Sequence, residues 1–355
     1  MKTICVALIV KNESRVIARC LKSLKPYIDH WVICDTGSTD DTKDIIRQSL
    51  SGVPGELHDT PWVNFGHNRT ELMGLAKGKA DYILLIDADM KLEVHDEQFK
   101  EGLSADSYLV GYTGELDYKQ KMLVKGSLDW EYVGATHEYI RSEQDLGMSV
   151  ASSISLTHFC DGSRRPEKFT DDIKLLEEGL LTEPENTRYM FYLAQSLYDT
   201  ERYSEAVHWY EKRADAGGWD EEVYFSLFKR AQSIVNLTQS FPLDDFVMAY
   251  DYRPKRMEAL HEVIKHYRKK EMYHFIYPIV KKAVESPYPR EDVLFIDKSI
   301  HDYKLMDELS ICAYWVGNYQ ESLDLCEDIL SNNELPDRDK LRVEKNKEFA
   351  KSKLI

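Results

Sequence analysis

Short apolar runs and amphipathic stretches alternate along the first part of the chain. Apolar runs predict three buried strands, at residues 4–10, 30–35 and 82–86. Apolar residues at helical spacing predict the helices between them, at residues 14–25, 41–50 and 65–76. Strands that alternate with helices indicate an α/β domain with a mainly parallel sheet, whose functional loops follow the carboxyl ends of the strands.

From about Lys168 onward the pattern changes to long helical stretches that are rich in tyrosine. Three segments fit the helix-turn-helix template of a tetratricopeptide repeat, the second and third more weakly: residues 191–210, 317–322 and 270–280. Because the spacing between these copies is irregular, a plain helical bundle is the alternative. The loop-like segment 161–166 marks the boundary. We therefore predict an α/β domain at 1–165 and an all-α domain, similar to tetratricopeptide repeats, at 166–355.

Composition narrows the classes of partner. The length of 355 residues allows two domains of about 100–200 residues each. Lys and Arg number 46 against 62 Asp and Glu, and the resulting net charge of −16 argues against nucleic acid as a partner. No apolar run approaches the roughly 20 residues that span a bilayer, so we expect no membrane span. Six cysteines without a CxxC pair indicate buried free thiols and a cytoplasmic protein.

Polar residues follow each predicted strand, at the edge where a parallel sheet gathers them. Asp87-Ala88-Asp89 follows the third strand, and two carboxylates this close can hold a divalent cation that binds a diphosphate. Alone this is a weak signal, because acidic residues commonly follow strands. Three further polar segments accompany it: Asn12-Glu13, residues 35–41 and Asn68-Arg69. Ser38 and Asp41 also have the spacing of a capping box, which predicts that Ser38 caps the second helix.

In this order the four polar segments resemble those of the inverting GT-A glycosyltransferases of family 2. The resemblance is specific over residues 1–90 and continues more loosely through Trp130 and residues 134–138 to His158. It implies a Rossmann-like GT-A catalytic domain. The helical half is similar to a subgroup in which this domain carries tetratricopeptide-like repeats, bacteriocin S-glycosyltransferases among them.

The resemblance implies a role for each polar segment. Asp35 would accept a hydrogen bond from the uracil imide of a UDP-sugar, and Asn12 and Glu13 would line the base and ribose. Glu13 has an alternative as a first-turn carboxylate favoured by the helix dipole. Arg69 would reach the base or the diphosphate, since its guanidinium suits phosphate geometry. Asp87 would serve the ribose and the metal shell.

Metal binding is implied at the same edge of the sheet. Asp89 would ligate the cation directly, and His158 matches the position of a distal histidine ligand in GT-A enzymes. This mixed O and N donor set favours Mn²⁺ over Mg²⁺, although an isolated histidine on a strand is commonly structural. Nearby cations would clamp the leaving diphosphate, or else belong to a solvated linker: Arg164, Arg165 and Lys168.

Inverting transfer also needs a base that deprotonates the acceptor. The resemblance implies Glu138 as that base, with His137 orienting it or the acceptor, although the family's frequent Glu-Asp pair is absent here. Trp130 would stack on the sugar or acceptor, or be an ordinary buried aromatic. The remaining candidate carboxylates are Asp129, Glu131 and Asp161.

Together these observations predict a metal-dependent inverting glycosyltransferase that moves a sugar from a UDP-sugar to an acceptor hydroxyl or thiol. The acceptor would be a glycan or a peptide or protein, and the repeats would bind it, wall its cleft or form a homodimer interface. A nucleotidyltransferase is the first alternative, although the glycine-rich phosphate loop of such enzymes is absent. A non-catalytic repeat scaffold with a degenerate nucleotide-sugar domain is the second.

Overall fold

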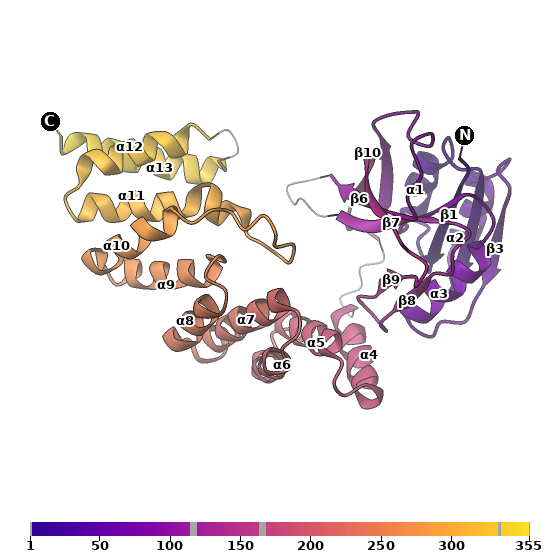
Figure 1. Ribbon diagram of the computed structural model, residues 1–355, viewed down its shortest axis with the longest axis horizontal. Helices are drawn as coiled ribbons and strands as arrows, with labels where there is room; N and C mark the ends of the chain where they lie inside the picture. Colours follow the sequence, from indigo (N-terminus) through magenta and orange to yellow (C-terminus); the bar gives the residue numbers. More distant parts are fainter. Residues whose placement is uncertain (1, 114–118, 163–167, 333–334, 355) are drawn as a thin grey trace. The chain divides into compact units, whose positions relative to one another are not determined.

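The computed structural model describes residues 2–113, 119–162, 168–332 and 335–354. The chain divides into two compact units, Met1–Pro184 and Glu185–Ile355 (Figure 1). The first helix of the predicted helical domain, α4 (Lys168–Thr182), belongs to the first unit. The boundary therefore lies later than residues 165/166, where the sequence predicts it.

An eight-stranded sheet forms the centre of the first unit, with the described strands in the order β3-β2-β1-β4-β7-β6-β10-β5. Its strands are β1 (Ile4–Val10), β2 (His30–Asp35), β3 (Gly55–Asp59), β4 (Tyr82–Leu85), β5 (Met90–Val94), β6 (Ser107–Tyr112), β7 (Lys119–Lys125) and β10 (Met148–His158). β1 pairs in parallel with β2 and β4, and β2 pairs in parallel with β3. β7 and β5 run antiparallel to their neighbours. The predicted parallel sheet is thus confirmed for four strands, and the other half is mixed.

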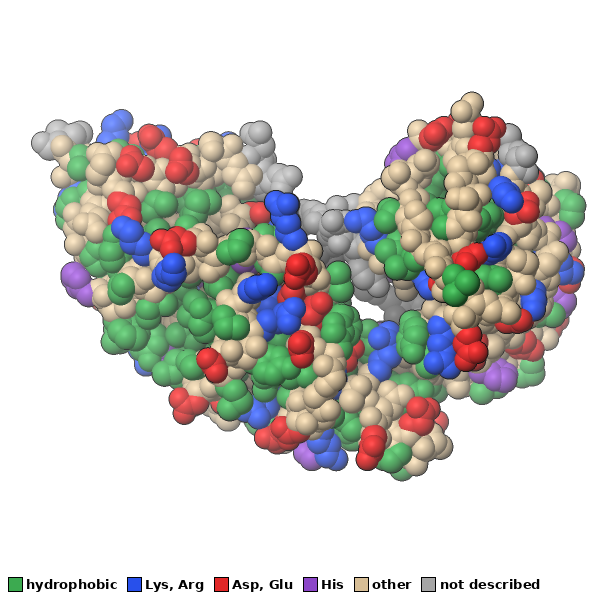
Figure 2. All heavy atoms as spheres, in the orientation of Figure 1, with side chains coloured by type: hydrophobic (Ala, Val, Ile, Leu, Met, Phe, Trp, Pro, Cys, Tyr) green, Lys and Arg blue, Asp and Glu red, His purple; other side chains and the backbone are tan. Residues whose placement is uncertain are grey.

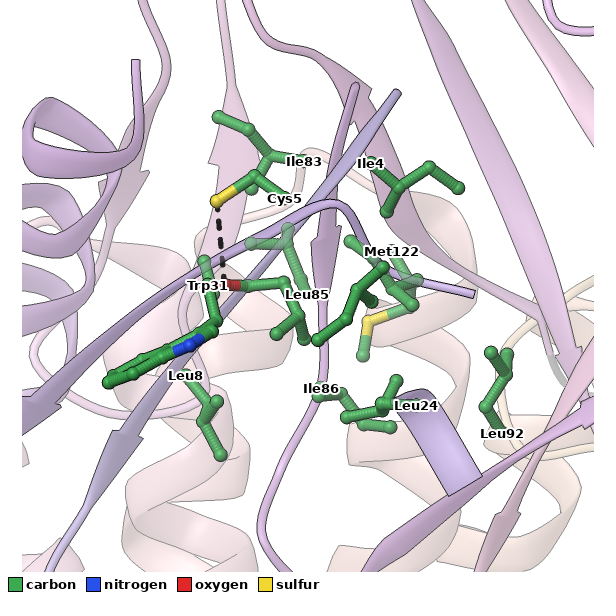
Figure 3. Close-up of a cluster of buried hydrophobic side chains, with 14 of the residues drawn as sticks. Ile4, Cys5, Leu8, Leu24, Trp31, Ile83, Leu85, Ile86, Leu92 and Met122 are labelled. Atoms are coloured by element: carbon green, nitrogen blue, oxygen red, sulfur yellow. Dashed lines mark hydrogen bonds between the residues drawn. The ribbon is translucent and has the colours of Figure 1, made fainter. Parts of the chain in front are cut away.

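The centre of this sheet is apolar on both faces. β1 reads ICVALIV and is buried at all but one position, as expected for a parallel strand covered on both sides. Figure 3 shows buried side chains of β1, β4, β7 and α1 (Ile17–Leu24) in one cluster. In the register of β1 and β2, Val10 lies opposite Asp35, so both strands end at the same edge. The polar loops that follow them therefore meet there.

Helices α1, α2 (Thr42–Ser49) and α3 (Phe65–Ala76) lie within the predicted helical segments, and β3, which precedes α3, was not among the predicted strands. Asn64 caps α3, because its side chain accepts a hydrogen bond from the His67 N–H. The predicted capping box at Ser38 is wrong. Ser38 Oγ instead accepts a hydrogen bond from the Asn12 N–H at 2.9 Å, and the side chain of Asp41 makes no capping hydrogen bond. The loop after β2 is thus tied to the loop after β1.

The second unit consists of helices. These are α5 (Thr187–Asp199), α6 (Tyr203–Asp215), α7 (Asp220–Thr238), α8 (Leu243–Tyr252), α9 (Glu258–Lys269), α10 (Tyr273–Val284), a π-helical turn (Ile300–Lys304), α11 (Leu305–Trp315), α12 (Tyr319–Leu330) and α13 (Asp337–Ser352). The three predicted helix-turn-helix segments are confirmed as the pairs α5/α6, α9/α10 and α11/α12. Their order along the unit can be followed in Figure 1.

The turns inside these three pairs share one backbone geometry. Glu201, Glu271 and Gly317 have positive φ angles of 61°, 59° and 91°. In each turn the next residue donates its N–H to the carbonyl five residues earlier, which closes the helix in a Schellman-type turn. The weak sequence similarity between the copies therefore reflects a common backbone requirement at one turn position.

The surface and the cysteines agree with the composition. Figure 2 shows acidic and basic side chains interspersed over the face drawn. Within the described ranges, no helix has both the length and the apolar character needed to cross a bilayer. All six cysteines are free and only Cys160 is exposed. Burial raises the pKa of Cys5 to about 12, so its thiol is a poor nucleophile.

The shared turn geometry predicts opposite effects for two substitutions. Glu271→Gly should raise the free energy of unfolding by up to about 1 kcal/mol, because glycine adopts a positive φ without strain. Gly317→Ala should lower it by a similar amount. Urea denaturation of both variants checks this. A destabilised Glu271→Gly variant would show that the glutamate side chain matters more than the backbone of the turn.

Candidate active site

Asp35 ends β2 and is buried at the carboxyl edge of the sheet. Its Oδ1 accepts hydrogen bonds from the N–H groups of Gly37 and Ser38, at 2.9 and 2.7 Å. Its Oδ2 is buried and has no hydrogen-bond partner among the described residues. A buried acceptor oxygen without a partner is costly, so this atom suits an N–H donor from a ligand.

The loop after β1 forms a wall beside Asp35. Asn12 has a left-handed backbone with φ 57°, and its Oδ1 accepts a hydrogen bond from the Thr39 N–H at 2.8 Å. The Glu13 N–H donates to Thr42 Oγ1 at 2.8 Å, and the Glu13 carbonyl accepts from the first turn of α1. These contacts tie the loop after β1 to the loop after β2. The contact of Asn12 and Glu13 with a base and ribose stays a prediction.

Arg69 joins two carboxylates that are distant in the sequence. Its Nη2 donates to Asp87 Oδ1 at 2.6 Å, and its Nε lies 2.7 Å from Glu138 Oε1. The Arg69 side chain is only 13% exposed. Burial lowers the pKa of Arg69, but the carboxylates of Asp87 and Glu138 raise it by more, so its pKa lies above the ordinary value. Arg69 is therefore a fixed cation between two anions.

The loop that carries Glu138 is held against α3. Residues 134–138 connect β8 (Glu131–Val133) to β9 (Tyr139–Arg141), which form a separate hairpin. The Phe65 N–H donates to the Ala135 carbonyl at 3.0 Å. Gly66 packs so closely that a β-carbon there would overlap the Gly134 carbonyl oxygen. One helix thus positions both Arg69 and the loop that Arg69 contacts.

Asp89 and His158 come together because β10 pairs with β5. His158 lies opposite Met90, the residue after Asp89, and its Nε2 is 3.1 Å from Asp89 Oδ2. The Gly162 N–H donates to the same oxygen at 3.3 Å. Burial raises the pKa of Asp89, but its hydrogen bond to His158 and the charge of that histidine lower it by more. Asp89 therefore stays ionised.

This pair fits the donor chemistry that the sequence predicts for a divalent cation. A carboxylate oxygen and an imidazole nitrogen lie side by side at the edge of the sheet. Among the described residues, no group of three His, Cys, Asp or Glu side chains stands close enough to hold a metal ion alone. Asp87 is turned toward Arg69 instead. Further ligands would therefore come from the substrate or solvent.

Arg19 secures the segment after β10. Its guanidinium pairs with both carboxylate oxygens of Asp161, at 2.8 and 2.5 Å, and lies 3.8 Å from the centre of the Phe159 ring. Its Nη2 also reaches the Asp89 carbonyl at 3.4 Å. Asp161, one of the alternative carboxylates, is thus occupied by an ion pair. Arg19 was not among the predicted residues, because nothing in the sequence relates α1 to residues 159–162.

Four other predicted residues lie away from this edge or have no described side chain. Trp130 is buried in the core, and its indole N–H donates to the Lys125 carbonyl at 2.9 Å, so we withdraw it as a sugar-stacking residue. Arg164 and Arg165 lie outside the described residues, and Lys168 begins α4 without a described side chain. The aromatic ring in the site belongs to Tyr132, 5.6 Å from the Arg69 guanidinium carbon.

The other alternative carboxylates take part in surface ion pairs, Asp129 with Lys77 and Glu131 with Arg141. A further carboxylate, that of Asp172 on α4, is buried against the hairpin loop, where Thr136 Oγ1 donates to its Oδ1 at 2.8 Å. Asp172 is not recognisable from the sequence, because Thr136 and Asp172 are far apart along the chain. A cavity of about 670 Å³ lies in the helical unit, and charged side chains of both signs line it.

Part of the chain is similar to known glycosyltransferases. Residues 5–104 match the sequence family described as Glycosyl transferase family 2. The first unit therefore contains a family 2 glycosyl transferase domain. The match includes Asp35, Arg69, Asp87 and Asp89, and it ends before the hairpin loop 134–138.

Similar proteins match only part of the chain. Over 230 residues it is 28% identical to the SPbeta prophage-derived glycosyltransferase SunS of Bacillus subtilis, covering 59% of this chain and 53% of SunS. An uncharacterized glycosyltransferase of Rickettsia felis is 34% identical over 99 residues, covering 27% of this chain and 33% of that protein. The solved S. aureus TarS 1-349 aligns with 72% of this chain and 92% of its own, at 14% identity and a TM-score of 0.40. The chain thus spans about half the length of SunS.

The contact between α3 and the hairpin loop predicts different effects for two glycines of the same helix. Gly66→Ala should lower the free energy of unfolding by about 1–3 kcal/mol, because the added methyl group meets backbone atoms. Gly74→Ala should raise it by about 1 kcal/mol, because this position is open and alanine favours the helix. Thermal and urea unfolding of both variants measure the difference. Equal stabilisation by the two substitutions would contradict the proposed packing.

Proposed function

We propose that this protein transfers a sugar from a nucleoside diphosphate sugar to an acceptor at the carboxyl edge of β1, β2 and β4. The observation that carries the proposal is the bridge in which Arg69 holds both Asp87 and Glu138. Asp87 belongs to the segment expected at the donor's diphosphate, and Glu138 belongs to the loop expected beside the acceptor. The bridge therefore joins the two sides of the proposed site. The family 2 domain at residues 5–104 supports the same class of reaction.

The donor is a UDP-sugar in this proposal. The buried Oδ2 of Asp35 supports uridine, because the imide N–H of uracil would supply the hydrogen bond that this atom lacks. Asn12 and Glu13 would line the base and ribose from the adjoining loop. Lys168 stays a predicted diphosphate-binding residue.

Asp89 and His158 would hold the divalent cation, with Asp87 next to them on the ribose side. Their oxygen and nitrogen donors favour Mn²⁺, and Mg²⁺ is the alternative. When bound, the cation would neutralise charge on the departing diphosphate. Asp87 is already paired with Arg69, which leaves Asp89 as the main carboxylate ligand.

The transfer itself is an in-line displacement with inversion. The acceptor O–H or S–H loses its proton to a base on loop 134–138, and its electron pair forms the bond to the anomeric carbon. The bond from that carbon to the diphosphate oxygen breaks, and its electron pair leaves with the nucleoside diphosphate. Glu138 is the base that the sequence predicts, and His137 is the other titratable residue of this loop.

The acceptor is a glycan or a peptide or protein in this proposal. The cavity of the helical unit supports a peptide, because its lining offers both acidic and basic partners such as Glu262 and Lys265. A homodimer through this unit stays a prediction.

Metal-dependent donor binding tests the proposal directly. UDP-sugars and GDP-sugars are screened by calorimetry with and without Mn²⁺, and UDP release is then followed for the donors that bind. Asp89→Ala and His158→Ala should weaken Mn²⁺ binding by about 10-fold or more, since each removes a donor atom. His95→Ala, which removes an exposed histidine bonded to Ser155, is the matched control. Absence of nucleotide binding with every donor would favour the non-catalytic scaffold.

The Arg69 bridge predicts a second effect. Arg69→Lys should lower the rate of UDP release by about 10-fold or more, because a single ammonium group cannot hold two carboxylates in the same geometry. Arg141→Lys, in the exposed pair with Glu131, is the control and should keep the wild-type rate. Steady-state UDP release measures both. Full activity of the Arg69→Lys variant would remove the bridge from the mechanism.

A further inference from the structure

The carboxylate of Glu138 is already engaged in the structure. Its Oε1 lies 2.7 Å from Arg69 Nε, and the Glu138 side chain is only 11% exposed. Transfer of a proton to this carboxylate would discharge one of the two anions that compensate the buried guanidinium. Because the pKa of Arg69 is raised, the arginine would keep its charge and lose a partner. This cost argues against Glu138 as the group that takes the proton.

The neighbouring residue has a different environment. The His137 side chain is 36% exposed, more than that of Glu138. Its backbone has φ 51°, a left-handed conformation that a non-glycine residue adopts only when its surroundings hold it there. Strained positions of this kind are common in active sites. The hairpin loop therefore presents an accessible imidazole beside a carboxylate that is paired with Arg69.

A buried carboxylate stands behind this imidazole. Asp172, on α4, is 2% exposed, and its Oδ2 lies 3.9 Å from His137 Nε2. The hydrogen bond from Thr136 Oγ1 to Asp172 Oδ1 fixes the carboxylate at 2.8 Å. Among the described residues, Asp172 from α4 is a charged group close to the His137 ring, and Glu138, the next residue of the loop, pairs with Arg69 from α3. A base oriented by a third group is the usual arrangement for activating a nucleophile.

We propose that His137 takes the acceptor's proton and that Asp172 is the positioning residue that orients His137. This inference rests on the proposed glycosyl transfer. It assigns the removal of the acceptor's proton to His137 in place of Glu138. The proton moves from the acceptor O–H or S–H to the ring nitrogen that faces away from Asp172. The freed electron pair forms the bond to the anomeric carbon, and the diphosphate leaves with the pair of the broken bond.

Asp172 stays ionised through this step and stabilises the imidazolium that forms. The 3.9 Å separation exceeds a hydrogen bond, and such contacts commonly shorten when substrate binds. Glu138 keeps a different task, because through Arg69 it holds Asp87 on the donor side. The two predicted roles in the loop are therefore exchanged: His137 takes the proton, and Glu138 is a positioning residue.

Hydrolysis of the donor tests this without knowledge of the acceptor, because water replaces it. UDP release with Mn²⁺ is measured for His137→Asn, Asp172→Asn, the double variant and Glu138→Gln. His137→Asn should lower kcat by about 100-fold or more, with the donor KM within about threefold of wild type. Asp172→Asn should lower kcat in the same way, and the double variant should be no slower than His137→Asn. Glu138→Gln should chiefly raise the donor KM.

Two controls separate positioning from simple stability. Thr136→Val removes the anchoring hydrogen bond but keeps the Asp172 charge. It should therefore lower the melting temperature and have only a small effect on kcat. The acid limb of the pH profile of kcat should disappear in His137→Asn, since protonated imidazole cannot accept a proton. If Asp172→Asn does not fold, the exposed His137 variant still decides the question.

The outcomes that overturn the inference are distinct from failure of the proposed function. Wild-type kcat in His137→Asn, or a Glu138→Gln variant that loses kcat at unchanged donor KM, returns the base to Glu138. Additive losses in the double variant would show that Asp172 does not act through His137. If no donor binds or releases UDP with the wild-type protein, the glycosyl transfer itself is wrong, and the inference falls with it.

Discussion

The candidate site depends on one buried cation. Arg69 pairs with Asp87, which follows the central strand β4, and with Glu138, which lies on a hairpin far along the chain. A guanidinium can do this because its nitrogens point in several fixed directions, whereas an ammonium offers one charge centre. Three features of the local packing hold this bridge in place. Asn64 caps α3, Gly66 lets the hairpin approach its first turn, and Tyr132 lies beside the guanidinium.

The elements that local pattern determines were predictable. The strands β1 and β2 and the helix α3 have the expected bounds, because strands and helices are encoded largely by neighbouring residues. The contacts of polar side chains were not predictable from the sequence. Ser38 has the spacing of a capping residue, yet it bonds the Asn12 N–H, since the parallel register places the two loops side by side. Asp172 gave no signal at all, because its partner Thr136 is distant in the chain.

The same limit explains the error at Trp130. Trp130, four positions before the hairpin loop, was expected near the sugar or to be buried, and a ring is indeed near the charged site. It is Tyr132, not Trp130, because successive aromatic positions here face different surroundings, the core for one and Arg69 for the other. The presence of an aromatic residue in this segment is evident from the sequence. The tertiary contact with α3, where Thr70 Oγ1 accepts the Tyr132 N–H at 2.8 Å, decides which one.

Three aspartates share the carboxyl edge of the sheet, and each is held by a different partner. Backbone N–H groups hold Asp35, a guanidinium holds Asp87 and an imidazole holds Asp89. These partners differ in how readily a ligand can replace them. Backbone donors cannot leave, so Asp35 offers only its second oxygen. Breaking the ion pair of Asp87 would take one of its two carboxylates from Arg69, whose side chain is only 13% exposed. The imidazole of His158 can turn from Asp89 and share a cation with it. Of the three carboxylates, that of Asp89 therefore has the partner that a metal ion could most readily share under the proposed function.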